Sequence, residues 1–338
     1  MTLPPELPET MLQAKLYGIG DLRLEEGPLP TIEDDEVLVR VEVCGICASD
    51  VRKFTAENYY PLKFPFNPGH EWTGTVVAVG RRHTKFQVGD RIVAEGQGGY
   101  APYAKINAHD LRFSTRLPDE VSFEAGIFTE PLADCIHAVV HRGGVRLGDK
   151  VVVVGAGSMG LMHANVAALA GADVLVSEPD PERRALAVDF GASVTVDPTA
   201  HNLRDAVEEW TKGKGADACI LTLSHPALID EAVHLVGARG RVILFASGPV
   251  GQRISLDPNR IHYKEILLTG SHWVGVSGYS DPSLYELAVD LIARKKVNVE
   301  ALITHRLPLT RIHEGFQLMQ ERKSLKVLVY PHQEAPVP

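Results

Sequence analysis

Residues 150–178 restrict the fold more than any other part of the chain. KVVVV at 150–154 is almost wholly apolar, as a buried parallel strand would be. The next six residues, GAGSMG, have the G-x-G-x-x-G spacing, and an apolar helix follows to about Ala170. A second predicted strand, ADVLVSE, ends at Glu178. A glycine motif between a strand and a helix, with an acidic residue at the end of the next strand, is typical of a domain that binds a dinucleotide.

Each part of the glycine turn has a task in such a domain. Gly155 would form the tight turn, Gly157 would let the backbone approach a pyrophosphate, and Gly160 would let the helix pack against the strand. Ser158 and Met159 lie at the start of the helix, where free N–H groups and the positive end of the helix dipole face the phosphates. These five residues are the predicted phosphate cradle.

Glu178 predicts which dinucleotide is bound. Its carboxylate can accept hydrogen bonds from ribose hydroxyls and would repel a 2′-phosphate, which favours NAD over NADP. Arg183 and Arg184 could meet a 2′-phosphate if their loop turned toward it, and Arg183 is included among the candidate cofactor residues. Pro181 after Asp180 has the pattern of a helix start, however, which places both arginines in a first helical turn on a solvated face.

The alternation of strands and helices continues beyond Glu178. Further strands are expected at 193–196, 217–223, 241–246 and near 266–271, and helices around 182–190, near 202–211 and at 226–236. Six strands with intervening helices predict a doubly wound parallel sheet. Residues 151–176 are nearly all apolar, but their polar residues and glycines fit a strand, a turn and a helix better than a membrane span, so no membrane partner is expected.

Charge and cysteine content exclude other classes of protein. The 338 residues carry a formal net charge of −9, which gives no electrostatic footprint for nucleic acid. The N-terminal segment lacks the basic and apolar regions of a secretory signal. Four cysteines in a chain of this length do not form the disulfide framework of a secreted protein, so a cytoplasmic location is expected.

The first half of the chain is β-rich. EVLVRVEVC (36–44) and TGTVVAVG (73–80) alternate like half-buried strands, and no long amphipathic helix is expected before about Phe123. Frequent Gly and Pro between short strands predict a small barrel or sandwich. A helix at 283–295 and a strand near 325–330 could close back onto this domain.

Cys44, Cys47, His70 and Glu71 form a candidate metal constellation. Thiolate with imidazole suits zinc better than magnesium or calcium, and a catalytic zinc keeps three protein ligands and one open position. Cys44 and Cys47 alone would also fit a redox pair or half of a structural site. The chain has no second C-x-x-C, however, and this segment is not a thioredoxin-like βαβ unit. His70 on its own would be an ordinary hydrogen-bonded histidine.

Together these segments resemble the zinc-dependent medium-chain dehydrogenases, the superfamily of alcohol and polyol dehydrogenases. The matching pieces follow the family's order over nearly the whole chain: GICASD (45–50), PGHEWTG (68–74), VGDRI (88–92), TEPLADCIHAV (129–139), the glycine motif and ALITHRLPLTRIHEGF (301–316). The resemblance implies an α/β fold in which a GroES-like β-barrel catalytic domain, residues 1–131 and 277–338, is interrupted by a Rossmann domain with a doubly wound parallel sheet, residues 132–276. It also implies an active site in the cleft between the two domains.

The resemblance assigns roles to residues of the constellation. Cys47 and His70 would be ligands of one catalytic Zn²⁺, and Glu71 would be a ligand in some states and an outer carboxylate in others. Ser49 matches the hydroxyl that passes on the substrate proton, and Asp50 matches the acid that would orient His70.

Three further residues take roles from the same resemblance. Glu130 stands where simple alcohol dehydrogenases have cysteine and sorbitol-type enzymes have glutamate, which implies direct or water-mediated coordination and a sugar, polyol or cyclitol substrate. Lys326 matches a position that can approach a cofactor phosphate, and a solvated edge-strand lysine is an equally good interpretation. Cys44 is a strand residue rather than a ligand.

The chain departs from the family at three places. Residues 94–110 are short and contain no cysteine where the family usually carries a four-cysteine lobe with a structural zinc, so this lobe is expected to be absent. Arg52 stands where simple alcohol dehydrogenases have a relay histidine, which leaves the proton exit open. VSGYSDP (276–282) offers no counterpart of the substrate-binding arginine of sorbitol dehydrogenases.

The predicted function is therefore hydride transfer between a secondary alcohol and NAD by a zinc-dependent oxidoreductase that forms a homodimer or homotetramer. A zinc-free quinone or enoyl reductase of the same superfamily is one alternative, and Cys47, His70 and Glu130 argue against it. A non-catalytic NAD-binding protein is another, and Ser49 together with the ligand types argues against that.

Overall fold

The computed structural model describes residues 7–56, 61–273 and 281–332. The chain packs into two compact units, Met1–Glu130 with Tyr285–Pro338, and Pro131–Leu284. The predicted domain boundary at 276/277 and most of the segment VSGYSDP lie outside the described residues, and the domain limits stay a prediction.

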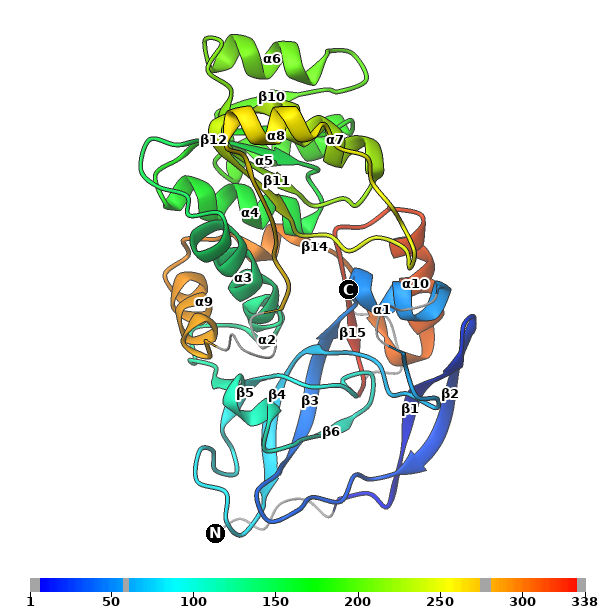
Figure 1. Ribbon diagram of the computed structural model, residues 1–338. Coiled ribbons are helices and arrows are strands. Elements are labelled where there is room, and N and C mark those ends of the chain that lie inside the picture. Colours follow the sequence, from blue (N-terminus) through cyan, green and yellow to red (C-terminus); the bar gives the residue numbers. More distant parts are fainter. Residues whose placement is uncertain (1–6, 57–60, 274–280, 333–338) are drawn as a thin grey trace. The chain divides into compact units, whose positions relative to one another are not determined.

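The first unit is built around a mixed β-sheet (Figure 1). Among the described residues its strands follow the order β14–β15–β3–β4–β5–β7, and β6 also pairs with β3. A separate antiparallel ribbon joins β1 and β2. The strands are β1 (Thr10–Gly18), β2 (Asp21–Pro28), β3 (Val37–Gly45), β4 (Glu71–Val79), β5 (Arg91–Ala94), β6 (Tyr103–Ile106), β7 (Thr115–Arg116), β14 (Ile303–Pro308) and β15 (Lys326–Tyr330).

The centre of this sheet is β3, which pairs with β4, β6 and β15. Its alternating sequence predicts a half-buried strand, but seven of its nine residues are buried, which shows that side chains on both of its faces are covered. Val37, Val39 and Val41 are fully buried and join the main core of the unit together with Trp72.

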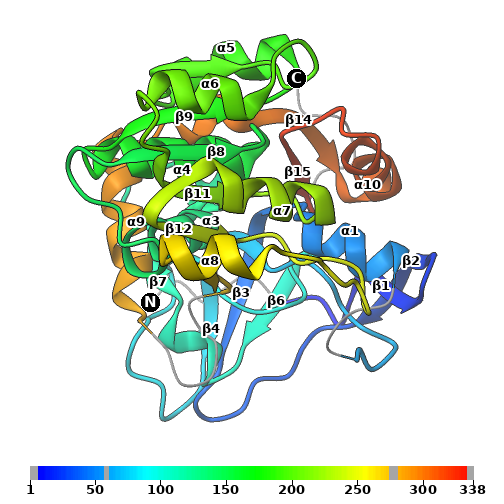
Figure 2. The ribbon, with the colours of Figure 1, turned by 45° about the horizontal axis from the view of Figure 1, so that its top comes forward.

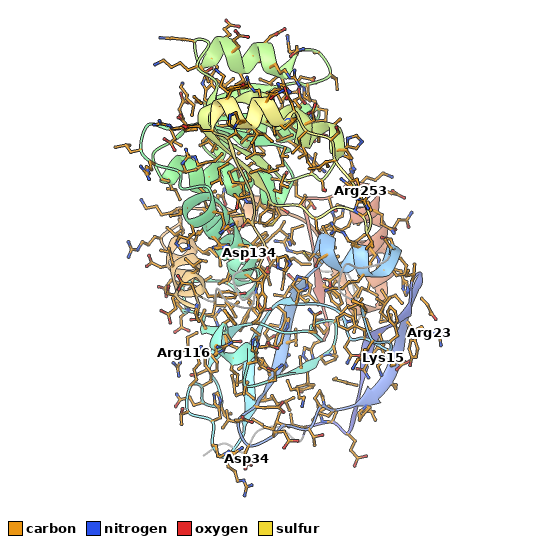
Figure 3. All side chains as sticks on the ribbon, in the orientation of Figure 1. Lys15, Arg23, Asp34, Arg116, Asp134 and Arg253 are labelled. Carbon is orange, nitrogen blue, oxygen red and sulfur yellow. The ribbon has the colours of Figure 1, made fainter. Side chains whose placement is uncertain are left out.

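The β1–β2 ribbon carries charged pairs on its outer side, where Lys15 and Arg23 extend from it (Figure 3). Lys15 Nζ lies 3.0 Å from Glu25 Oε1, and Arg23 Nη2 lies 2.6 Å from Asp21 Oδ2. Exposed pairs of this kind contribute little to stability. The ribbon is therefore held mainly by its backbone ladder and by the buried Leu16.

The helices of the first unit are short. The sequence did not predict α1. This helix begins after Cys47, whose side chain accepts the N–H of Ser49, and the helix packs against α10. The helices are α1 (Ala48–Thr55), α2 (Phe123–Gly126), α10 (Ile312–Gln320) and single turns at Asp110–Arg112, Val299–Leu302 and Leu309–Arg311. A further helix, α9 (Ser283–Ala293), belongs to this unit from Tyr285 onward.

The second unit contains a parallel sheet in the order β10–β9–β8–β11–β12–β13 among the described residues. Its strands are β8 (Lys150–Val154), β9 (Asp173–Ser177), β10 (Val194–Val196), β11 (Ala216–Leu221), β12 (Val236–Leu244) and β13 (Leu267–Gly270). The six strands are those predicted from the sequence, and β12 begins earlier than expected through an irregular pairing of Ala216 with Val236. The strand order reverses beside β8, which is the place where such sheets bind ligands.

Helices connect successive strands of this sheet. They are α4 (Ser158–Leu169), α5 (Pro181–Asp189), α6 (Leu203–Trp210), α7 (Pro226–Leu235) and α8 (Pro258–Lys264), and α3 (Thr129–Ile136) leads into the unit and continues as a π-helical turn, His137–Arg142. The helix α4 packs against α5, whereas α7 contacts both α6 and α8. Figure 2 shows α7 and α8 side by side in front of the sheet.

The apolar window at 151–176 belongs to this sheet. It forms most of β8, then α4 and most of β9, in which Val151–Val153 and Val174–Val176 are buried. Within the described part of the chain, none of the helices has the length and apolar character that spanning a membrane requires.

Candidate functional site

Pairing of β3 with β4 brings the predicted metal ligands together. Gly45 at the end of β3 lies opposite Glu71 at the start of β4. Cys47 follows Gly45 by two residues, and Ile46 N–H donates to Val327 O at 2.9 Å, which ties this segment to β15. The antiparallel register therefore places Cys47 beside the residues that enter β4.

Cys47, His70 and Glu71 each offer one ligand atom, and these atoms all lie within 4.8 Å of one another. Glu71 is buried, while the Cys47 and His70 side chains are partly exposed. Ser49 Oγ lies 3.5 Å from His70 Nε2. Asp50 Oδ1 faces the other ring nitrogen of His70, Nδ1, at 3.3 Å.

The electrostatics of this cluster favour a bound cation. Burial alone would lower the pKa of His70, but the negative charges of Asp50 and Cys47 raise it well above its usual value. Burial would raise the pKa of Asp50, but His70 and Lys53 together hold it well below its usual range. The cluster thus attracts positive charge, either a proton on His70 or a metal ion.

Glu71 also forms an ion pair with a residue that is not a candidate metal ligand. The ammonium of Lys326 forms an ion pair with Glu71 Oε2, and both side chains are almost completely buried. Burial would lower the pKa of Lys326, but Glu71 and Cys47 raise it, so the lysine stays charged. Lys326 lies in β15 between β14 and β3, and its interpretation as a solvated edge-strand lysine is wrong.

Glu130 and Cys44 lie outside the group of mutually close ligand atoms. Glu130 is buried in the first turn of α3, and its charge helps to raise the pKa of Lys326. Cys44 is fully buried in β3 and its Sγ donates to Gly45 O at 3.6 Å. Coordination by Glu130, directly or through water, therefore stays a prediction.

The glycine turn of the second unit has the geometry of a phosphate cradle. Gly155 has φ +100°, and a Cβ at Gly160 would stand 2.0 Å from Gly155 O. Nothing lies within 4 Å of the position that a Cβ at Gly157 would take. Gly157 caps α4 without a side-chain hydrogen bond, so the N–H groups of Ser158 and Met159 begin the helix beside open space.

Glu178 is buried and bound to this turn. Its Oε2 accepts the N–H of Ala156 at 2.7 Å and its Oε1 accepts the N–H of Asp180 at 3.0 Å. Each carboxylate oxygen has a second lone pair that can accept a ribose hydroxyl. The structure therefore brings Glu178 to the cradle predicted from the sequence.

The two arginines after Glu178 lie in the first turn of α5, as predicted, but both are half-buried rather than on a solvated face. Asp180 caps this helix by accepting the N–H groups of Glu182 and Arg183. Arg184 Nη1 donates to the backbone oxygens of Glu178 and Pro179 at 2.7 and 2.6 Å, and its Nη2 lies 3.2 Å from Asp197 Oδ2. These contacts hold Arg184 in place.

Two residues near Asp50 were missed from the sequence. Lys53 Nζ lies 3.4 Å from Asp50 Oδ1, and the i, i+3 spacing of the two residues could have indicated this pair once α1 was recognised. Tyr100 donates its hydroxyl to Asp50 Oδ2 at 2.8 Å across a sequence separation of 50 residues. The sequence contains no local signal for the tyrosine contact.

Two family models match the chain. The model of the alcohol dehydrogenase GroES-like domain matches residues 33–130, and the model of the zinc-binding dehydrogenase matches residues 158–294. D-arabitol-phosphate dehydrogenase of Enterococcus avium is 30% identical over 348 residues, covering 94% of this chain and 96% of the relative. Sorbitol dehydrogenase of Homo sapiens is 30% identical over 349 residues, covering 94% of this chain and 95% of the relative.

Solved structures share the fold over nearly the whole chain. The 2R,3R-butanediol dehydrogenase of Bacillus subtilis has a TM-score of 0.82 at 28% identity and covers 95% of this chain and 100% of that chain. A Sinorhizobium meliloti protein with NADP bound has a TM-score of 0.85 at 26% identity, with coverage of 96% and 100%. The predicted α/β fold with a Rossmann domain and a GroES-like domain is thus confirmed. Since relatives at 30% identity match almost the full length of both chains, the protein belongs to the zinc-type medium-chain dehydrogenase/reductase superfamily of alcohol and polyol dehydrogenases.

Proposed function

We propose that this protein oxidises a secondary alcohol of a sugar, polyol or cyclitol with NAD and that it uses one Zn²⁺ per chain. The observation that carries the proposal is the sulfur, nitrogen and oxygen ligand set of Cys47, His70 and Glu71, whose atoms lie within 4.8 Å of one another. A dinucleotide cradle elsewhere in the same chain supplies the second requirement of such a reaction.

The residues present fit a zinc ion. Zn–S and Zn–N bonds of about 2.0–2.3 Å place tetrahedral ligand atoms about 3.3–3.8 Å apart. The ligand atoms of Cys47, His70 and Glu71, which lie within 4.8 Å of one another, reach this spacing with small side-chain movements. The raised pKa of His70, caused by Asp50 and Cys47 against the effect of burial, agrees with a site that binds a cation. Cys47 and His70 would hold the ion, and Glu71 would join them when it is released from Lys326.

The bound ion would supply Lewis-acid chemistry, because it lowers the pKa of a hydroxyl bound to it and so favours the alkoxide. Ser49 would be the hydroxyl that passes on a substrate proton, since its Oγ lies 3.5 Å from His70 Nε2, beside the residues that would hold the ion. Asp50 orients the His70 ring from the opposite nitrogen. Cys47, Ser49, Asp50, His70 and Glu71 all belong to the first unit.

Cofactor choice rests on Glu178. Its buried carboxylate accepts the N–H of Ala156 in the glycine turn and the N–H of Asp180, which supports recognition of ribose hydroxyls at this turn. Arg184 is already engaged by the backbone oxygens of Glu178 and Pro179 and by Asp197, so a 2′-phosphate would have to compete with these contacts for its guanidinium. We therefore propose NAD, although one solved relative carries NADP.

The substrate class follows from the relatives and from Glu130. The curated relatives at 30% identity are named for D-arabitol phosphate and sorbitol. Glu130 stands at the position where the sorbitol-type branch has glutamate. A buried carboxylate near Lys326, rather than a second thiolate, supports a polar substrate with several hydroxyls.

A panel of alcohols and polyols, assayed by the absorbance of the reduced nicotinamide with NAD and NADP in parallel, tests the proposal. The wild type is expected to oxidise at least one polyol with NAD and to contain about one zinc per chain. Cys47→Ser should lose most of its zinc and activity, whereas Cys44→Ala, which changes the neighbouring buried thiol, should keep both. Full activity in Cys47→Ser would refute the metal site, and a preference for NADP would refute the role of Glu178.

A further inference from the structure

The segment that connects β5 with β6 brings a tyrosine behind the candidate metal ligands. The Tyr100 side chain is almost completely buried, at 1% exposure. Its hydroxyl lies 2.8 Å from Asp50 Oδ2 and 3.2 Å from Gly45 O. Burial and the nearby Asp50 raise the pKa of Tyr100 well above its usual value, so the hydroxyl stays protonated and donates. The shorter contact, to an ionised carboxylate, is the stronger of the two.

The ring of Tyr100 is fixed on several sides. A Cβ at Gly69 would approach the Tyr100 ring and backbone N at 3.0 Å, so the ring packs directly on the residue before His70. Gly99 N–H donates to Gly69 O at 3.0 Å, and Ala14 N–H donates to Tyr100 O at 2.9 Å. The Phe316 ring meets Tyr100 edge-on with centroids 6.1 Å apart. The hydroxyl is therefore presented to Asp50 by a rigid support.

The two oxygens of Asp50 have different partners. Oδ2 accepts from Tyr100, while Oδ1 faces His70 Nδ1 at 3.3 Å and Lys53 Nζ at 3.4 Å. A carboxylate that is held at one oxygen cannot rotate freely at the other. The contact of Oδ1 with His70 Nδ1 is an ion-pair contact without hydrogen-bond geometry, and the other ring nitrogen, Nε2, lies 3.5 Å from Ser49 Oγ. The Tyr100 hydrogen bond thus fixes the carboxylate whose second oxygen lies beside the His70 ring.

We propose that Tyr100 is a positioning residue for the metal site and acts on His70 through Asp50. This inference rests on the proposed zinc site but concerns a residue with no direct contact to the ion. Removal of a group that orients a metal ligand typically weakens metal binding 10–100-fold. Because Tyr100 lies one step further out, a weakening of about 3–10-fold in zinc affinity is expected for Tyr100→Phe.

The test compares the full-length wild type with Tyr100→Phe and Tyr103→Phe. Tyr100→Phe removes one oxygen and keeps the ring that packs on Gly69. Tyr103→Phe is the matched control, because Tyr103 lies in the same stretch and its ring contacts His332 rather than Asp50. Zinc affinity is measured by chelator competition, and the cobalt-substituted proteins are compared by their visible d–d spectra.

Tyr100→Phe should bind zinc about 3–10-fold more weakly and shift the cobalt spectrum, while Tyr103→Phe should match the wild type. In an Asp50→Asn background, the additional effect of Tyr100→Phe should vanish, because the two residues act as one chain. The inference is overturned if Tyr100→Phe leaves both affinity and spectrum unchanged, or if its effect persists undiminished in Asp50→Asn. Failure of the wild type to bind one zinc or cobalt ion would instead refute the proposed function.

Discussion

Gly157 and Gly160, in the turn after β8, differ in how much space surrounds them. Alanine substitutions at the two positions should therefore distinguish an effect on packing from an effect on cofactor binding. A Cβ at Gly160 would stand 2.0 Å from Gly155 O and 2.8 Å from Gly155 C. At Gly157 the backbone has φ −70°, and nothing lies within 4 Å of the Cβ position. We therefore expect Gly160→Ala to destabilise the protein and Gly157→Ala to impair dinucleotide binding.

The loss of stability in Gly160→Ala follows from the contact with backbone. The obstructing atoms belong to Gly155, not to a flexible side chain, so strand and helix must separate by about 1 Å or more to restore ordinary contact. Overpacking of this kind costs about 1–3 kcal/mol. The higher helix propensity of alanine returns about 1 kcal/mol. The 2.0 Å contact with backbone places the cost in the upper half of that range, so the net loss is about 1–2 kcal/mol, which would lower Tm by about 2–8 °C.

Gly157→Ala should leave the stability of the free protein nearly unchanged. Alanine is a poorer N-cap than glycine, which costs a few tenths to about 1 kcal/mol, and it reduces the entropy of the unfolded chain by a similar amount. The new methyl group would occupy the open space before α4, where a pyrophosphate approaches the backbone. NADH binding should therefore weaken about tenfold or more, equivalent to about 1.4 kcal/mol.

The assay is thermal unfolding of the full chain with and without NADH, combined with direct titration of NADH. At about 100 times the wild-type Kd, NADH should stabilise the wild type by about 2.7 kcal/mol and Gly157→Ala by only about half as much. A lower Tm for free Gly157→Ala than for free Gly160→Ala would contradict the packing argument. Wild-type affinity of Gly157→Ala for NADH would contradict the position of the cradle.

Three further predictions concern charged side chains of the first unit. Burial raises the pKa of Glu95 to about 7, against the lowering effect of the Tyr285 hydroxyl. The contribution of Glu95 to stability is therefore greatest below the unfolded pKa near 4.5 and is lost as pH rises through about 7. Thermal unfolding should show Glu95→Gln to be more stable than the wild type by up to about 3 kcal/mol at about pH 8 and by about 1 kcal/mol at about pH 5. Lys326→Met leaves Glu71 buried without its ion-pair partner and should cost about 3–5 kcal/mol of stability in metal-free protein. Adding zinc should raise the Tm of this variant more than the Tm of the wild type. Equal increases of Tm would exclude competition between Lys326 and the metal for Glu71. Arg306→Met removes a bidentate pair with Glu124, at 2.9 and 2.7 Å, and should cost about 0.5–1 kcal/mol in urea unfolding at neutral pH, because both side chains are about one-third exposed and Glu124 keeps the Tyr330 hydroxyl. The Arg306 hydrogen bond holds the pKa of Glu124 below its usual value, so this loss should shrink as pH falls below about 4.5.

The second unit could be predicted from the sequence almost strand by strand. Its strands are apolar runs bounded by glycine, proline or acidic caps, and both signals are local. The helix α8 was missed because none of its residues is buried, so it has no apolar stripe to reveal it. The glycine turn and Glu178 were found together because one continuous segment, residues 150–178, contains the whole βαβ unit.

The metal cluster was only partly accessible to the same reasoning. Cys47, His70 and Glu71 stand in two short motifs, and a local pattern was enough to select them. The partners of their neighbours come from distant strands: Lys326 reaches Glu71 across 255 positions and Tyr100 reaches Asp50 across 50. Only the pairing of β3 with β4, β6 and β15 determines which side chains meet behind the ligands.

These distant partners control how the cluster can receive an ion. Asp50 and Glu71 are both buried carboxylates beside His70, and each is compensated by a cation of the chain, Asp50 by Lys53 and Glu71 by Lys326. Asp50 is also held by Tyr100, so it stays at the outer nitrogen of His70. Among the described residues, the ion-pair partner of the Glu71 side chain is the Lys326 ammonium. A divalent ion bound by Cys47 and His70 would attract Glu71 more strongly than one lysine charge. Ion binding should therefore move Glu71 and Lys326 while Asp50 and Tyr100 keep their positions, which is why the Lys326→Met and Tyr100→Phe variants should have opposite effects on zinc-induced stabilisation.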